Sequence, residues 1–169
     1  MPMREILLPE FDQEMATTRR LLERVPEDRL DWTPHAKSFT LQALLSHVVD
    51  LPGWIPMTLD QDALDVAPEG QEPWKTPQME TQAAWLAAFD ANVAAGRASL
   101  EQLEDARLAD IWAMKAGARV LFSAPKGAVL RGFVFNHLVH HRAQLGVYLR
   151  LLDVPLPGSY GPTADERMM

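Results

Sequence analysis

The sequence predicts an all-α four-helix bundle with long loops between the helices and a small hairpin before the last helix. Three observations favour this fold. Four long segments carry apolar residues at helical spacing, strand-like sequence is confined to one short region, and no internal repeat or second domain is visible. We therefore expect residues 1–169 to form one domain around one core.

The first predicted helix runs from Met3 to Arg24, because apolar residues recur there every three or four positions. Pro26 closes this helix, and Pro9 either begins its regular part or bends it. The residues after Pro26, up to position 35, form a polar connection with room for one helical turn. His35 in this connection is expected at the surface.

The second predicted helix covers Phe39 to about Leu51, with Ser38 as its N-cap and Pro52-Gly53 bending or ending it. Residues 56–76 are rich in Asp, Pro, Gln and Gly and are predicted to form a long loop. Helix order around the bundle stays open, since loops of this length allow helices that are not sequential to be neighbours.

The third predicted helix begins at Thr76-Pro77 and ends near Glu104, and its many alanines allow a neighbouring helix to approach closely. Residues 111–115 and 119–122 are predicted as the hairpin. The fourth helix is expected to open near residues 123–125 and to continue to about Leu152.

The fourth helix carries three of the five histidines. At about 100° per residue, His141 lies roughly 40° from His137 on an apolar stripe, and His140 lies about 60° to the other side, at the margin of the stripe. His47 lies on the apolar side of the second helix by the same arithmetic. Each histidine alone can be a core residue with a backbone or carboxylate partner, and Asp50 is a candidate partner for His47.

Together, His47, His137 and His141 predict a metal site, because helix bundles build such sites from inward side chains on facing helices. Three imidazoles suit Zn²⁺, Ni²⁺, Fe²⁺ or Co²⁺ and leave a coordination position open. Gln144 lies about 20° from His137 and is either a group that bonds a metal-bound water or a substrate, or a buried amide satisfied by backbone. His140 could take the place of His141 as a ligand, but it is expected beside the site or at an interface, since it lies further from the centre of the stripe.

The composition limits the classes of function. A net charge of −7 and a pI near 5.2 argue against nucleic acid as a partner. The chain has no cysteine, no apolar run long enough to cross a membrane and no signal peptide, so we expect a cytoplasmic protein. Residues 111–152 hold six Lys or Arg and no carboxylate, which predicts a solvated basic face or a surface for an anionic ligand or an acidic helix of the same fold.

Two further features of the fourth helix concern contacts. Arg142 points away from the stripe and is predicted to make a salt bridge or a subunit contact. Phe135, Val139 and Gly146 share the opposite side, which another segment of the chain or a second subunit must cover.

The segments Asn136-His137-x-x-His140-His141-Arg142-Ala143-Gln144 and Ser38-Phe39-Thr40-Leu41-x-x-Leu44-x-x-His47 resemble those of the DinB-like (YfiT-like) family. Residues 25–35 and 160–166 resemble its recurrent flanking segments, so the resemblance covers nearly the whole chain. Ala143 departs from the pattern, in which glycine often follows the arginine.

The resemblance implies a four-helix bundle, often a homodimer, with a divalent metal held by His47, His137 and His141. Zn or Ni is expected first, then Fe, Co or Mn. It also implies a metal-dependent S-transferase or isomerase that uses a low-molecular-weight thiol of the mycothiol or bacillithiol type on a small-molecule substrate. The alternatives are a metal-dependent hydrolase and a non-catalytic metal-binding dimer of a stress response, in which Asp50 or His140 would close the metal site.

Overall fold

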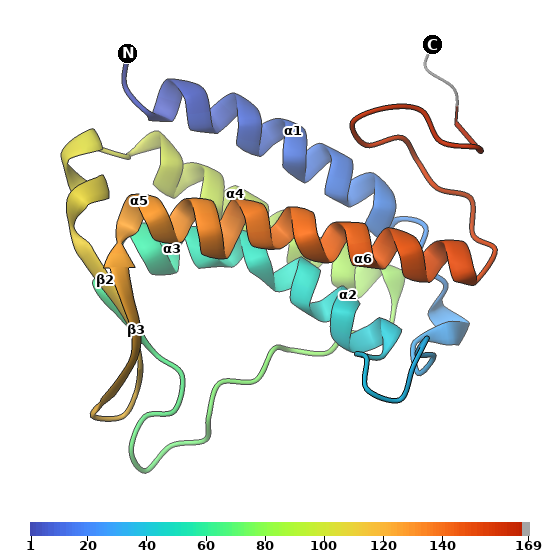
Figure 1. The fold of residues 1–169 in the computed structure, drawn as a ribbon, viewed down its shortest axis with the longest axis horizontal. Helices are drawn as coiled ribbons and strands as arrows, with labels where there is room; N and C mark the ends of the chain where they lie inside the picture. Colours follow the sequence, from blue (N-terminus) through green and yellow to red (C-terminus); the bar gives the residue numbers. More distant parts are fainter. Residues whose placement is uncertain (167–169) are drawn as a thin grey trace.

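The computed structural model describes residues 1–166, which form four long helices and a small sheet at one end of them (Figure 1). The long helices are α1 (Arg4–Leu22), α2 (Leu41–Asp50), α4 (Gln82–Glu101) and α6 (His137–Leu151). Short 3₁₀ turns lie at Glu27–Arg29, Leu51–Gly53 and Asp105–Ala109. The prediction of a four-helix bundle is thus confirmed in outline, and the first of these turns is the helical turn expected in the connection after Pro26.

The helices are not packed in sequence order. Helix α1 contacts α4 and α6, and α2 contacts the same two helices, so α1 and α2 lie on opposite corners of the bundle. Helices α2 and α6 are therefore neighbours, although nearly ninety residues separate them along the chain. This arrangement brings the two histidine-bearing helices together.

A small three-stranded sheet accompanies the four-helix bundle, one strand more than the predicted hairpin. Strand β1 (Ala63–Asp65) pairs in parallel with β2 (Ile111–Ala116), which pairs antiparallel with β3 (Arg119–Pro125). The β2–β3 pair is the predicted hairpin. Strand β1 lies in the region predicted as a loop, because a three-residue strand has no pattern of its own and forms only by pairing with β2.

Helix starts also differ from the predictions. Thr40, not Ser38, caps α2, since its Oγ1 accepts the N–H of Ala43 at 3.1 Å. Thr81 caps α4 in the same way, so the cap lies five residues after Thr76 and the helix begins at Gln82. Pro9 lies inside α1 and does not begin it.

Helical structure does not end at Pro52-Gly53. It passes through the 3₁₀ turn there and continues as α3 (Trp54–Leu59). The core fills the space between the four long helices, with Phe11, Leu44, Trp85, Phe89 and Leu138 among its fully buried side chains. None of the helices in residues 1–166 has the length and apolar character needed to cross a membrane.

Candidate metal centre

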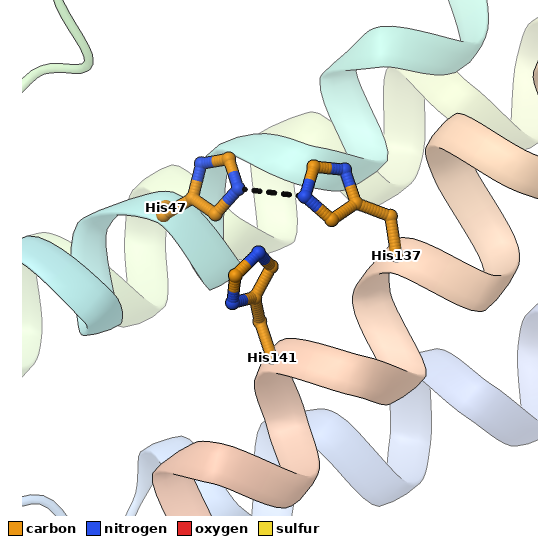
Figure 2. A group of neighbouring side chains, drawn as sticks. All are labelled: His47, His137 and His141. Atoms are coloured by element: carbon orange, nitrogen blue, oxygen red, sulfur yellow. Dashed lines mark hydrogen bonds between the residues drawn. The ribbon is translucent and has the colours of Figure 1, made fainter. Parts of the chain in front are cut away.

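The three histidines predicted as ligands lie together between α2 and α6 (Figure 2). His47 extends from α2, and His137 and His141 extend from α6 one turn apart. The Nε2 atoms of His47 and His137 are 3.2 Å apart, and the potential ligand atoms of all three residues lie within 4.8 Å of one another. The structure therefore brings together the residues that the two helical patterns singled out.

These spacings suit a small divalent cation. Metal–nitrogen bonds of about 2.0–2.1 Å place two ligands of a tetrahedral ion about 3.3 Å apart. The 3.2 Å between His47 Nε2 and His137 Nε2 matches this value. The ring centroids of the three imidazoles are 4.6–4.9 Å apart, so all three rings border one space.

Two of the imidazoles have their other nitrogen held by a hydrogen bond. His137 Nδ1 lies 3.2 Å from the carbonyl oxygen of Phe133, and His141 Nδ1 lies 2.7 Å from Oε1 of Gln144. Carbonyl oxygens only accept, so each Nδ1 carries the hydrogen and donates it. His137 and His141 then carry on Nε2 the lone pair that a metal would bind, in the arrangement that metal-binding histidines usually have. In the structure that lone pair of His137 faces Nε2 of His47.

A π-helical segment, Leu130–Asn136, provides the partner of His137. It connects α5 (Lys126–Val129) to α6 without a break. At its end the backbone N–H of His137 donates to Val134, so it does not occupy the Phe133 carbonyl as it would in a regular α-helix. That carbonyl accepts the His137 ring instead. Short π-helical turns occur often at functional sites.

The side of the fourth helix predicted to need a cover is covered at Phe135. Phe135, predicted on the side away from the core stripe, is buried and packs edge-on against Phe11 of α1. Leu151, at the C-terminal end of α6, is largely exposed. Of the two covers predicted for this side of the helix, a segment of the same chain therefore lies over Phe135, since α1 packs there.

The surroundings keep all three histidines neutral at pH 7. Burial, with a smaller contribution from the nearby His141 and His137 rings, lowers the pKa of His47 to about 4. Burial is also the main reason that the pKa values of His137 and His141 lie below the ordinary value, although the hydrogen bonds to Phe133 and Gln144 oppose this shift. Neutral imidazoles are the form that binds metal.

Asp50 and His140, the candidates for a fourth ligand, lie outside this group of three. Asp50 accepts the indole N–H of Trp54 at 3.2 Å, and burial raises the pKa of its carboxyl. His140 is exposed, with its ring centroid 4.8 Å from that of His141. Among residues 1–166, the potential ligand group thus consists of three histidines.

The helical periodicity placed Gln144 on the apolar stripe that faces the core. In the structure its side chain is not buried. It is exposed and its amide oxygen orients His141. Sequence periodicity could not reveal this contact, because it depends on the rotamers of both side chains.

Arg142 makes the predicted salt bridge. It is 4% exposed and lies 2.6 Å from a carboxylate oxygen of Glu14 on α1. Its guanidinium also donates to Thr18 Oγ1 and to the hydroxyl of Tyr160 in the C-terminal segment. Arg142 therefore ties α6 to α1 on the side away from the histidines.

Two cavities adjoin the histidines. One, of about 450 Å³, is lined by His47 and its α2 neighbours and by the segment before α4: Phe39, Ala43, Ser46, Lys75, Thr76 and Gln78. The other, of about 420 Å³, is lined by His137 and His140 with Gly132, Phe133 and Asn136. One cavity thus borders His47 and the other borders His137.

A family model for the DinB family matches residues 3–168. The chain belongs to the DinB family. The DinB-like resemblance drawn from the histidine segments is confirmed by this match. The chain is 27% identical over 162 residues to an uncharacterized protein, YrdA, of Bacillus subtilis strain 168, with 94% of this chain and 89% of YrdA covered.

Two solved DinB-like structures share the fold. A protein from Bacillus cereus ATCC 10987 is 22% identical, covers 90% of this chain and 95% of its own, and gives a TM-score of 0.66. YjoA of Bacillus subtilis is 18% identical, covers 95% and 98%, and gives a TM-score of 0.67. At these identities the likeness establishes the DinB-like fold, and the activity must be argued from the site.

Proposed function

We propose that this DinB family protein holds a divalent metal through His47, His137 and His141 and acts as a transferase or isomerase that uses a low-molecular-weight thiol. Zn²⁺ and Ni²⁺ fit three neutral imidazoles best, with Fe²⁺, Co²⁺ and Mn²⁺ as alternatives. The observation that carries the proposal is the convergence of three neutral imidazoles, with no fourth protein ligand among the described residues, beside two cavities.

The metal would bind the thiol sulfur and lower the pKa of the thiol, so that a thiolate is present at neutral pH. The chain itself has no cysteine, so the sulfur nucleophile must come from a cosubstrate. The residues of the chain would hold the metal and orient its ligands, since Phe133 and Gln144 fix the ring positions of His137 and His141. The two cavities provide separate places for the thiol and for the small electrophile.

A metal-dependent hydrolase is less well supported. That reaction needs a general base near the site, and Asp50, the nearest candidate from the sequence, is engaged with Trp54 outside the histidine group. A closed, non-catalytic site is also less well supported, because it would need a fourth protein ligand.

The test combines metal analysis with a panel of thiols. We expect the purified protein to contain close to one divalent metal per chain, and the metal-loaded protein to catalyse addition of a thiol to an electrophilic acceptor. His137→Ala is expected to lose both properties. His35→Ala is the matched control, since His35 is exposed in the loop before α2. Equal metal content or equal rates in wild type and His137→Ala would rule the proposal out.

We also propose that the protein is a homodimer through the outer face of α6. Val147 and Leu151 are 59% and 58% exposed there, and a cavity of about 420 Å³ lies between this face, α1 and the C-terminal segment. The exposed apolar side chains favour a second copy as the cover. Light scattering should give twice the chain mass for wild type and one chain mass for Val147→Glu, and a monomeric wild type would exclude the dimer.

A further inference from the structure

Ser46 precedes His47 on α2 and is only 1% exposed. Its hydroxyl is the one buried side-chain polar atom in residues 1–166 that has no hydrogen-bond partner. Buried hydroxyls are almost always bonded, because an unpartnered one gives up its bonds to water without replacement. The unpartnered Ser46 hydroxyl, next to the candidate metal ligand His47, therefore indicates that a ligand binds beside these two residues.

The place for such a group is the cavity of about 450 Å³ that Ser46 and His47 line together. Its opposite wall is formed by Lys75, Thr76 and Gln78, from the extended segment that leads into α4. Phe39, 56% exposed, forms an apolar edge of the same cavity. A ligand in this space touches a hydroxyl, an apolar ring and one ammonium group.

Lys75 is the charged side chain of this lining that remains available to a ligand. It lies 3.2 Å from Glu72, but the two side chains are 77% and 87% exposed, so the pair is weak and easily exchanged.

The basic residues of the α5–α6 region are already occupied by carboxylates of the protein. These pairs are Lys126–Asp62, Arg131–Glu10, Arg142–Glu14 and Arg150–Asp165. Four of the six basic residues in the stretch 111–152 thus pair within the fold, and two of them pair with α1, as expected for an acidic helix of the same fold. The cation beside the histidines comes instead from the segment before α4.

We propose that this cavity binds a thiol that carries a carboxylate, with the carboxylate at Lys75, the carbon chain against Phe39 and the sulfur end at His47. The Ser46 hydroxyl donates to a polar group of the bound thiol. This inference rests on the proposed thiol-dependent function, and it names the substrate class and the residues that select it.

The test uses Co²⁺-loaded protein and two matched pairs of probes: 3-mercaptopropionate with 3-mercaptopropanol, and 6-mercaptohexanoate with 6-mercaptohexanol. Calorimetry gives the Kd of each. We expect the acid of at least one pair to bind about fivefold more tightly than its alcohol, the size of effect that one charge-assisted contact at a partly exposed site provides. Lys75→Met should remove this preference, while Lys115→Met, on β2 and outside the cavity lining, should keep it.

Ser46→Ala supplies a second readout. It should weaken thiol binding about threefold or more, since one hydrogen bond to the ligand is lost. Its melting temperature without ligand should equal or exceed that of wild type, because the substitution removes an unpartnered buried hydroxyl. A lowered melting temperature would show that Ser46 has a structural partner, and would overturn its assigned role.

Absence of an acid preference in both pairs, or its persistence in Lys75→Met, would overturn the carboxylate site. The Co²⁺ absorption spectrum separates this failure from a failure of the proposed function. Missing Co²⁺ bands, or no sulfur-to-Co²⁺ charge-transfer band with any of the four probes, would refute the metal–thiol function. The calorimetric comparison of acid with alcohol tests the carboxylate site in the cavity independently of the metal–thiol function.

Discussion

The hydrogen bond between Gln144 and His141 leads to a prediction about metal affinity. Gln144 Oε1 accepts the Nδ1–H of His141 at 2.7 Å, which holds the ring in the tautomer that presents Nε2 to a metal. Gln144→Ala removes this partner and lets the ring rotate and exchange tautomers. We expect the variant to bind Zn²⁺ more weakly than wild type.

The magnitude follows from the position of the bond. Loss of a group that orients a metal ligand typically costs about 10–100-fold in affinity. Gln144 is exposed, so water can replace its oxygen in part, and the loss should lie near the lower end, about tenfold or about 1.4 kcal/mol. Gln144→Glu keeps an acceptor and adds a negative charge, so its affinity should equal or exceed that of wild type.

Competition with a chromophoric chelator at pH 7.5 measures these affinities. Gln102→Ala, an exposed glutamine at the end of α4, is the control and should match wild type. If Gln144→Ala binds Zn²⁺ as tightly as wild type, the orienting role is wrong. If that variant also loses turnover, Gln144 acts on water or substrate, which is the catalytic role that the sequence predicted for it.

Three further predictions concern pH and stability. The pKa of His47 is about 4 in the fold and near 6.5 in the unfolded chain. Metal-free protein should therefore keep its free energy of unfolding above pH 6.5 and lose about 2 kcal/mol of it as the pH falls toward 4. Urea unfolding across pH measures this loss, which should be smaller in His47→Gln. Arg142→Met should cost about 3–5 kcal/mol in the same assay, because it leaves the carboxylate of Glu14 buried without its partner, and Glu14→Met in the same chain should recover most of this loss. Gly96→Ala should destabilise by about 1–2 kcal/mol, since its Cβ would lie 2.9 Å from a carbonyl oxygen at the bend after α2, whereas Gly146→Ala, with open space around its Cβ, should not.

Periodicity in the sequence was sufficient for the four long helices and for the sides on which His47, His137 and His141 lie. Helical periodicity predicts these features because burial of an apolar stripe is the main force that fixes a helix in a bundle, and the spacing of apolar residues in the sequence defines that stripe. Helix boundaries were less accurate. Ser38 and Thr76 are good capping residues, but Thr40 and Thr81 supply the caps, because tertiary contacts decide where each chain segment turns into its helix.

The tertiary structure alone decided which helices are neighbours, and hence that α2 and α6 bring the three histidines within ligand distance. It also decided the pairing of β1 with β2, the π-helical turn that frees the Phe133 carbonyl for His137, and the exposed rotamer by which Gln144 reaches His141. The absence of a hydrogen-bond partner for the buried Ser46 hydroxyl is likewise a feature that only the tertiary structure decided. Each of these depends on contacts between residues far apart in the chain, or on side-chain rotamers, and neither leaves a periodic signal in the sequence.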